Sequence, residues 1–448
     1  MSGRVRVPLK TYLGLGLPML AIGGWYYPIL ILLPPFLSEQ YGLEMVAGAL
    51  LAVRVFDLFT DTLAGRVSDM LPRLSGGRLG RRKPIIAFGL AIFSAAMIAL
   101  ILPGTLSDIA WLIAVMVLVM IGETMLRVPY KAWVAEAVTD YNARSRVAAL
   151  RSLLVYLGVL IAAICSAIAE SKTGGDPYWR FAGALIPVLI MALVFIPLSF
   201  VLLAEPETGG AAAEERAGFF TAVRQLSANA AFVRLAFINF IHEYADAINS
   251  ALIVFFVVNV LLLPEDVGPS FVVSLLVGIG GLAFFTIVSQ FFDKHRVMVA
   301  ALIGAIATSL GALLIQPGNL TSLLIYMSVM AFFASADGVM MDAMEADLVD
   351  ADEALSGERR AGLVAGTMNT IGKLPEVLGT SMVFVALAML GFDPREETSD
   401  PASVRTLFVI VPVVLKLAVL ALLLRYPLGG AAHARLRAEL SKRQAAKG

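Results

Sequence analysis

The sequence predicts an all-α membrane protein with twelve transmembrane helices arranged as two six-helix bundles. Of its 448 residues, 59% are hydrophobic and only 15% are charged, and the mean hydropathy is +0.85. A soluble domain carries about 25% charged residues. This chain would therefore expose too much apolar surface in water, and its solvent must be lipid.

Apolar segments of bilayer length recur along the whole chain. A spanning helix needs about 20 apolar residues, and twelve candidates lie near residues 12–37, 44–69, 84–103, 108–136, 147–169, 180–203, 230–258, 269–292, 297–316, 320–347, 361–390 and 403–426. The longest polar interruption separates the sixth candidate from the seventh. We therefore expect an N-terminal bundle over residues 1–204, a cytoplasmic linker over 205–229, and a C-terminal bundle with a cytoplasmic tail over 230–448.

Basic residues predict the orientation in the membrane. Lys and Arg are concentrated before the first span, in the even-to-odd connections and in the tail, whereas the opposite connections hold few. Cytoplasmic loops carry such an excess. The pattern predicts a multi-pass protein of the cell (inner) membrane with both termini in the cytoplasm.

The second span carries ionisable side chains on one face. Arg54, Asp57 and Asp61 are spaced by three and four residues, which aligns them along a helix. Each ionisable group inside a span costs about 2.5–3.5 kcal/mol on insertion scales. Two carboxylates one turn apart also repel, so they need a cation, a nearby base or a shared proton. With hydroxyls from Thr60 or Thr124, they predict a site for Na+, or a carboxyl group that carries a coupling proton; a buried ion pair that only fixes helix register is the alternative.

Further polar groups inside spans are candidate substrate contacts. They are Trp25, Tyr26, Glu123, Arg127, Arg151, Glu243, Asp246 and Asp337. Trp25 and Tyr26 could stack on a solute or belong to an interfacial aromatic belt. His242 beside Glu243 could relay protons near neutral pH or serve as a hydrogen-bonded partner.

Several function classes are excluded. The single cysteine, Cys165, cannot form an intrachain disulfide and makes a metal cluster improbable. The sequence contains no P-loop, no nucleophile elbow and no HExxH motif. We therefore expect no enzyme activity, no cofactor and no direct use of ATP. A net charge of zero gives no support for nucleic-acid binding, and we expect a monomer that transports a small solute with an ion gradient.

Five segments carry a family resemblance. Residues 65–69 (GRVSD) with 80–84 (GRRKP) resemble the loop between helices two and three of the major facilitator superfamily. Residues 54–61 (RVFDLFTD) resemble the R-x-x-D-x-x-x-D of the melibiose-permease-like glycoside–pentoside–hexuronide:cation symporters. Residues 128–136 (VPYKAWVAE) and 369–379 are similar to segments of that family's fourth and eleventh helices. Residues 346–350 (ADLVD) with 357–362 (GERRAG) resemble the family's A-D-V-x-D…G-x-R-R-E-G stretch.

The resemblance implies the major facilitator fold and roles for individual residues. Asp57, Asp61 and Thr124 would bind the cation, Lys373 and Arg54 would couple it to transport, and Arg151 would lie near the substrate. The loop residues Gly65, Asp69, Arg81 and Arg82 would act as gates. This sequence also departs from the sugar-transporting members, because its first helix lacks a carboxylate and its fourth carries Arg127.

These departures favour an acidic or modified glycoside over a neutral disaccharide, since arginine pairs with carboxylate, sulfonate or phosphate. The expected function is symport of such a solute with Na+ or H+. Three alternatives stay open: a lysolipid or amphiphile symporter of the same family, a proton-coupled exporter, and a membrane sensor that transports nothing.

Overall fold

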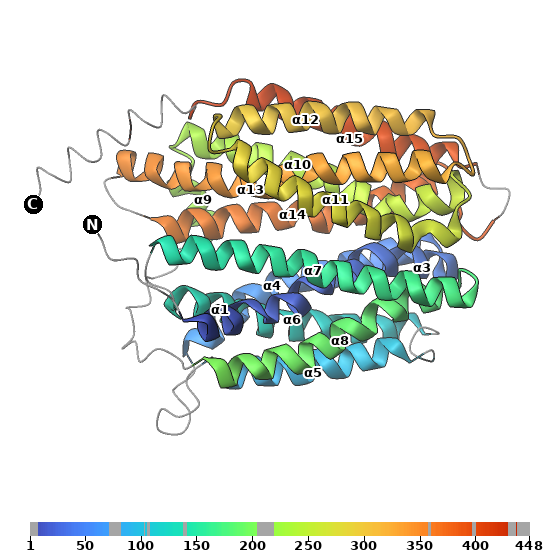
Figure 1. Ribbon diagram of the computed structural model, residues 1–448, viewed down its shortest axis with the longest axis horizontal. Coiled ribbons are helices and arrows are strands. Elements are labelled where there is room, and N and C mark those ends of the chain that lie inside the picture. The colour runs from blue at the N-terminus through green and yellow to red at the C-terminus, as the bar shows by residue number, and fades with distance from the viewer. Residues whose placement is uncertain are drawn as a thin grey trace, which may run out of the picture. The chain divides into compact units, whose positions relative to one another are not determined.

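The protein is helical throughout the part of the chain that the computed structural model describes (Figure 1). That part comprises residues 8–70, 82–102, 104, 108–137, 141–203, 219–356, 360–396, 400–428 and 436, and within it some helical residues, such as 58–70 and 141–146, are described by their backbone only. The prediction of an all-α membrane protein is confirmed. Eleven described helices are long and apolar enough to cross a bilayer.

Most of the expected spans correspond to helices within a few residues, but the tenth, expected over 320–347, continues to residue 356. Eleven of them match spanning helices, and the expected second span coincides with α4 (Leu43–Met70), a helix of 28 residues that is not among the eleven. Arg54 and Asp57 lie in the middle of α4. The side chains of α4 are described only as far as Asp57, and that part is too short to be assessed as a span.

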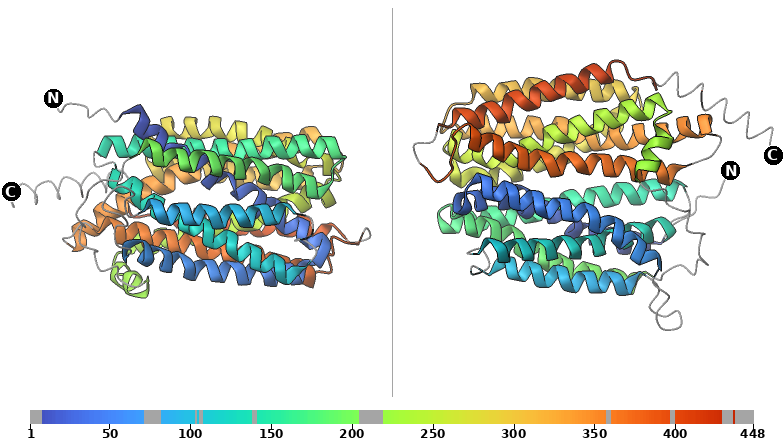
Figure 2. Two further views of the ribbon diagram at one scale, coloured as in Figure 1. Left: turned by 90° about the horizontal axis from the view of Figure 1, so that it is seen from below. Right: turned by 180° about the vertical axis from the view of Figure 1, so that it is seen from behind.

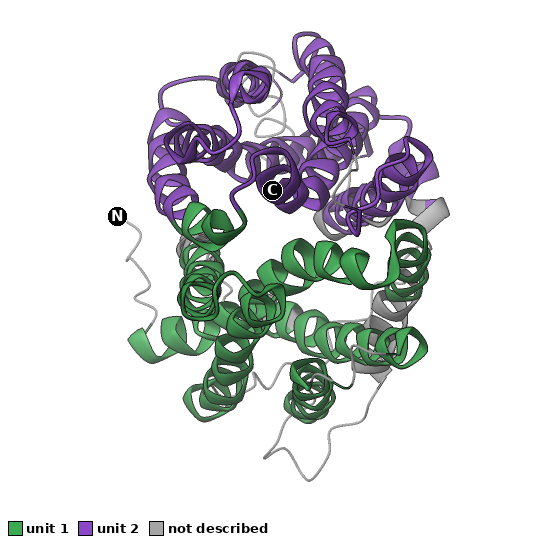
Figure 3. Ribbon diagram, turned by 90° about the vertical axis from the view of Figure 1, so that its right-hand side faces the viewer, with its two compact units in different colours: residues 1–214, 264–272 green, residues 215–263, 273–448 purple. Residues whose placement is uncertain are grey.

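The chain divides into two compact units, coloured separately in Figure 3. Unit 1 contains residues 1–214 and 264–272, and unit 2 contains residues 215–263 and 273–448. Most of unit 1 is built from α1 (Leu9–Gly16), α2 (Pro18–Gly24), the π-helical turn η1 (Tyr27–Leu32), α3 (Leu33–Tyr41), α4, α5 (Lys83–Ile101), α6 (Ile109–Ala137), α7 (Tyr141–Thr173) and α8 (Pro177–Leu202).

Unit 2 begins with a short helix, α9 (Phe219–Leu226), followed by α10 (Ala230–Phe255) and the π-helical turn η3 (Phe256–Val260). The short η4 (Pro264–Asp266) and the start of α11 (Val267–Val288) belong to unit 1, and the rest of α11 belongs to unit 2. The remaining elements of unit 2 are α12 (Lys294–Gly311), η5 (Ala312–Leu314), α13 (Leu320–Ser356), α14 (Ala361–Met389) and α15 (Ala402–Leu423). Figure 2 gives two further views of these helices.

Proline residues break the first span into pieces. Pro18 begins α2, and Pro28 lies in the π-helical turn that separates α2 from α3. Proline has no backbone N–H to donate and its ring crowds the preceding turn, so it kinks or widens a helix. Such turns are frequent at functional sites. Trp25 and Tyr26 lie at this break, between α2 and η1.

Glycine brings α2 and α7 into close contact in unit 1. A Cβ atom on Gly158 of α7 would overlap the carbonyl oxygen of Leu20 in α2, and one on Gly23 would lie 2.6 Å from Cγ1 of Val155. Small residues allow such approach between transmembrane helices, where packing rather than the hydrophobic effect drives association. This contact sets the distance between the aromatic pair on the first span and the polar residues of α7.

Gly158→Ala should therefore push α2 and α7 apart and lower stability by about 1–3 kcal/mol, because the added methyl group overlaps backbone atoms that cannot rotate away. The melting temperature of the purified protein measures this. Gly48→Ala is the matched control, since a Cβ atom there meets nothing within 4 Å. Equal losses from the two substitutions would contradict the packing argument.

A buried ion pair joins four elements of unit 1. Arg180 of α8 donates from Nε to Oε1 of Glu170 in α7 over 2.8 Å, and from Nη2 to the carbonyl oxygen of Pro264 over 2.6 Å. The second carboxylate oxygen of Glu170 accepts the backbone N–H of Gly268 at 3.0 Å. Both side chains are buried. The pair ties the start of α11 to α7 and α8.

Unit 2 is built around α10, which packs against α14 and α15. Phe256 stacks on Phe408 of α15 with ring centroids 4.4 Å apart. Two ion pairs lie elsewhere in the unit, joining Lys294 to Asp347 and Arg360 to Asp352 over 2.6 and 2.7 Å. Two polar residues of α10, His242 and Asp246, contact side chains of α13 and α15.

Candidate functional site

Asp57 and Thr124 meet at the contact between α4 and α6. The hydroxyl group of Thr124 donates to Oδ1 of Asp57 over 3.3 Å, and both side chains are buried. The two residues are 67 positions apart in sequence, so helix packing alone brings them together. The structure thus joins two of the four predicted cation ligands. Thr60 and Asp61 follow on α4, but their side chains lie outside the described part.

Arg127 and Glu123 form an ion pair along α6. Nε of Arg127 lies 2.6 Å from Oε1 of Glu123, one turn away on the same helix. Glu123 is buried and Arg127 is partly buried. Because Glu123 already compensates its charge, Arg127 is less available to a solute anion than its sequence position alone indicates.

Arg151 of α7 has a different environment. Its Nη2 lies 3.4 Å from Sδ of Met19, and its guanidinium group lies 5.7 Å from the centre of the Tyr130 ring. Tyr130 donates its own hydroxyl hydrogen to backbone carbonyl groups, reaching that of Leu15 at 2.6 Å. Nε of Arg151 is buried and has no hydrogen-bond partner among the described residues, and none of the described carboxylates forms an ion pair with this arginine. A sulfur atom and an aromatic face are weak partners for a guanidinium.

Trp25 and Tyr26 lie side by side at the break in the first span. Their ring centroids are 5.0 Å apart, and the ring planes are tilted by 35°. Trp25 is 3% exposed, whereas Tyr26 is 43% exposed. The indole Nε1 of Trp25 has no hydrogen-bond partner in the described structure. The pair therefore presents one accessible aromatic ring and one buried donor.

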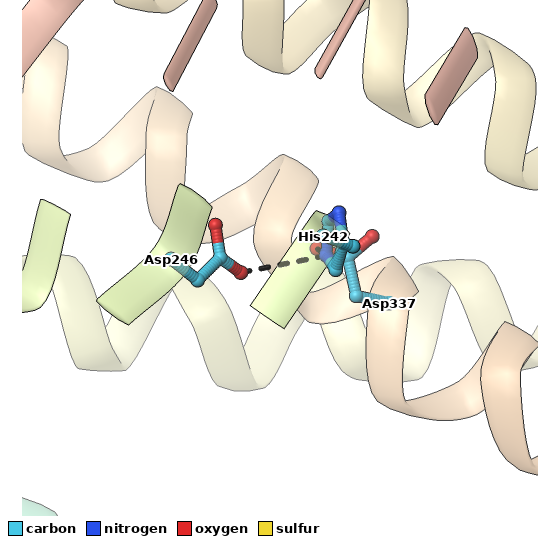
Figure 4. A group of neighbouring side chains, drawn as sticks. All are labelled: His242, Asp246 and Asp337. Carbon is cyan, nitrogen blue, oxygen red and sulfur yellow. Dashed lines mark ion pairs between the residues drawn. The ribbon is translucent and has the colours of Figure 1, made fainter. Parts of the chain in front are cut away.

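Unit 2 contains a second polar cluster, made of His242, Asp246, Asp337 and Lys416. Nε2 of His242 lies 3.0 Å from Oδ2 of Asp337 and 3.4 Å from Oδ2 of Asp246. The ammonium group of Lys416 lies 3.0 Å from Oδ1 of Asp246. Figure 4 shows His242 between the two carboxylates. Asp246 and Asp337 were predicted to contact the substrate. In the structure Asp246 pairs with Lys416, and Asp337 has the imidazole of His242 as its neighbour.

Lys416 was missed by the sequence analysis. It is almost fully buried in α15, within the expected span 403–426. A lysine inside an apolar span is itself a signal, since such a residue almost always pairs with an acid or faces a cavity. Its partner, Asp246, lies on α10, far away in the sequence.

The remaining predicted residues fall in different places. Glu243 is exposed on α10, and Lys373 lies partly buried on α14 in unit 2. Among the expected gates, Arg82 is buried at the start of α5. Arg81 lies outside the described residues, as do the side chains of Gly65 and Asp69. The gating roles stay predictions.

The family is identified by comparison with known proteins. Residues 14–430 match the family model described as MFS/sugar transport protein. The chain belongs to this family. It is thus a multi-pass transporter of the cation-coupled glycoside symporter family, within the major facilitator superfamily, and not an enzyme. The resemblance inferred from the sequence motifs is confirmed.

Curated relatives align with this transporter over most of its length. It is 24% identical to "Putative glycoside/cation symporter YagG" of Escherichia coli (strain K12), over 99% of this chain and 97% of that protein. It is also 24% identical to the "Glucuronide carrier protein homolog" of the same organism, over 85% of this chain and 83% of that protein.

Solved structures show the same fold. The nucleoside transporter NupG matches with a TM-score of 0.67 at 13% identity, covering 93% of this chain and all of that chain. A bacterial homologue of the human lysosomal transporter Spinster, crystallised inward-facing and unoccupied, matches with a TM-score of 0.60 at 15% identity, covering 96% and 97% of the two chains. These neighbours confirm the major facilitator fold.

Proposed function

We propose that this transporter moves an acidic or modified glycoside together with Na+ or H+ across the cell membrane, with both of its termini in the cytoplasm. The environment of Arg151 carries the proposal. This guanidinium is partly buried, with its Nε fully buried, yet a sulfur atom and an aromatic ring are its nearest partners among the described residues. An uncompensated buried charge is costly, and a solute carboxylate would compensate it.

The chemistry of arginine suits an acidic sugar. Its planar guanidinium offers paired N–H donors that match the two oxygens of a carboxylate. Arg127 is already paired with Glu123, so Arg151 is the better candidate for this contact. Tyr26 supplies accessible aromatic surface for the sugar ring, and the buried ring of Trp25 packs beside it. The printed name of one relative, a glucuronide carrier homologue, agrees with an acidic glycoside.

The cation would bind near Asp57. Its carboxylate and the hydroxyl of Thr124 are hard oxygen ligands, and Asp61 and Thr60 follow on the same helix α4. Arg54 on α4 and Lys373 on α14 would couple cation binding to the solute. A cation at Asp57 would permit both aspartates to stay ionised, which their repulsion otherwise opposes.

A thermal-stability screen of the purified protein tests the solute class. We expect 4-nitrophenyl β-glucuronide to raise the melting temperature, more so with sodium or at lower pH, because a ligand stabilises the state that it binds. The matched neutral probe is 4-nitrophenyl β-glucoside. Equal stabilisation by the glucoside would contradict an acidic substrate. Stabilisation by lysophosphatidylcholine instead would favour the lysolipid alternative.

Arg151→Gln should weaken binding of the glucuronide by about 10- to 100-fold, because hydrogen bonds to a charged group contribute about 1.5–3 kcal/mol. Binding of the neutral glucoside should change little. Titration of the melting temperature with each probe measures both effects. Lys10→Gln serves as the control, since Lys10 is an exposed positive charge of unit 1. Equal losses for the glucuronide from the two substitutions would refute a direct role for Arg151.

A further inference from the structure

Three helices of unit 2 bring four ionisable groups together. His242 and Asp246 lie one turn apart on α10, Asp337 lies on α13, and Lys416 lies on α15. The imidazole ring is 2% exposed, whereas the side chain of Asp246 remains 37% accessible. The histidine is thus buried beside carboxylates that are only partly buried, and Figure 4 shows the three side chains. Nothing in the proposed cation site at Asp57 involves these residues.

The charges of the cluster do not balance while His242 is neutral. Lys416 compensates the charge of Asp246 at 3.0 Å. The ion-pair partner of Asp337 is the imidazole at 3.0 Å, which compensates the carboxylate only when it is protonated. A neutral imidazole leaves one negative charge in excess. A protonated imidazole brings the four groups to zero, which a poorly solvated environment strongly favours.

The surroundings of the two ring nitrogens make the charged imidazolium less favourable. Nε2 faces two carboxylates, so the neutral ring keeps its hydrogen there. A second proton must therefore bind Nδ1. Both ring nitrogens are buried without a hydrogen bond of good geometry among the described residues, but only Nε2 has carboxylates at 3.0 and 3.4 Å. A buried N–H without an acceptor costs about 1–3 kcal/mol. Attraction to Asp337 and this missing acceptor act in opposite directions, which is the condition for a proton that exchanges.

A metal ion fits the cluster less well. The ligand atoms of His242, Asp246 and Asp337 are close enough to surround one, within 4.8 Å of one another. However, the ammonium of Lys416 already occupies Asp246 and would repel a second cation. A proton on the imidazole, unlike a metal ion, needs no additional space between the carboxylates.

We propose that His242 is a proton-binding site of unit 2, which takes up one proton from solvent at Nδ1 and is stabilised in its charged form by Asp337. The site is distinct from the proposed cation site at Asp57. It gives the second unit a charge that depends on pH, whichever cation drives transport. The proposal stands independently of the identity of the solute.

Other charged groups face the same helix and affect this proton. Lys416 lies within electrostatic reach of Asp337 as well as Asp246. Glu243 of α10 lies within electrostatic reach of His242, Asp246 and Asp337, and of Glu376 on α14. Lys373 lies one turn before Glu376 on α14.

Nuclear magnetic resonance of a single-histidine protein tests the proposal. The chain has three histidines, so His295→Gln with His433→Gln leaves His242 as the only one. The full chain, labelled with ¹⁵N-histidine and placed in lipid nanodiscs, would be titrated from about pH 5 to 9, the range in which histidine changes charge. We expect one transition, from a ring with a single N–H at Nε2 to a ring with both nitrogens protonated.

Asp337→Asn keeps the shape of the side chain and removes its charge. It should move the transition to lower pH by about one unit or more. Asp342→Asn, an exposed position on the same helix α13, is the matched control and should leave the transition unchanged. The titration of the single-histidine protein decides the question even if the Asp337 variant fails to fold.

Four outcomes would overturn the proposal. The ring could stay neutral across the range, or it could stay charged throughout as a fixed ion pair. Asp337→Asn and Asp342→Asn could also shift the transition equally. Addition of zinc or sodium at constant pH checks the metal alternative. A shift of both ring signals that Asp246→Asn abolishes would assign the cluster to a metal ion.

Discussion

Asp57→Asn is expected to remove most of the effect of the coupling cation on this transporter. The amide keeps the size of the carboxylate but loses the charge that attracts a cation, and charge-assisted contacts contribute about 1.5–3 kcal/mol each. We expect apparent cation affinity to fall by about 100-fold and gradient-driven uptake to disappear. The measurement is the melting temperature of purified protein against sodium concentration, repeated against pH.

Thr124→Val should weaken cation binding less than Asp57→Asn does. Thr124 donates a hydrogen bond of 3.3 Å to Asp57, so its loss should weaken cation binding by about tenfold and leave coupling intact. Asp57→Asn should also leave the melting temperature without cations nearly unchanged, which separates a binding defect from misfolding. The proposed site would be refuted if the melting temperature of Asp57→Asn responded to both sodium and pH as that of the wild type does.

Arg180→Leu is expected to destabilise unit 1 by about 3–5 kcal/mol. The substitution leaves the fully buried carboxylate of Glu170 without its cationic partner, and breaking a buried pair on one side costs this much. It also leaves the carbonyl oxygen of Pro264 without the donor that now lies 2.6 Å away. Loss of monodisperse protein and a lower melting temperature report the effect.

A double substitution separates the charge from the packing. Glu170→Leu combined with Arg180→Leu removes both charges, and apolar replacements of buried pairs are often well tolerated. We expect the double variant to be more stable than Arg180→Leu alone, with the residual loss coming from the unpaired N–H of Gly268. Additive losses in this double-mutant cycle would show that the two residues do not stabilise each other.

Much of the fold could be predicted from hydropathy. A lipid-exposed backbone has to satisfy its own hydrogen bonds, so long apolar segments become helices, and the expected segment 230–258 corresponds to a spanning helix over residues 230–260. Interruptions within a span were harder to locate. The first segment is broken near Pro28 by a π-helical turn, because the outcome at a proline depends on the neighbouring helices that repair the lost hydrogen bond.

The candidate site could be predicted in part. Spacing along α4 singled out Asp57, and Thr124 was one of two hydroxyl groups expected beside it; the structure brings Thr124 to Asp57. The pairing of Arg127 with Glu123 was available from their separation of four residues. That Arg151 has no acidic partner among the described residues could not be predicted, because it depends on every helix that packs around this residue. The pairs Glu170–Arg180 and Asp246–Lys416 likewise join different helices, and only tertiary packing brings them together.

The account depends on one link, between a cation gradient and an anionic sugar derivative. Uptake of 4-nitrophenyl β-glucuronide into proteoliposomes, with an inward gradient of sodium or of protons and with neither, tests it most directly. The account predicts accumulation above the external concentration with at least one gradient and simple equilibration without them. Entry at the same rate and to the same level under all three conditions would contradict it.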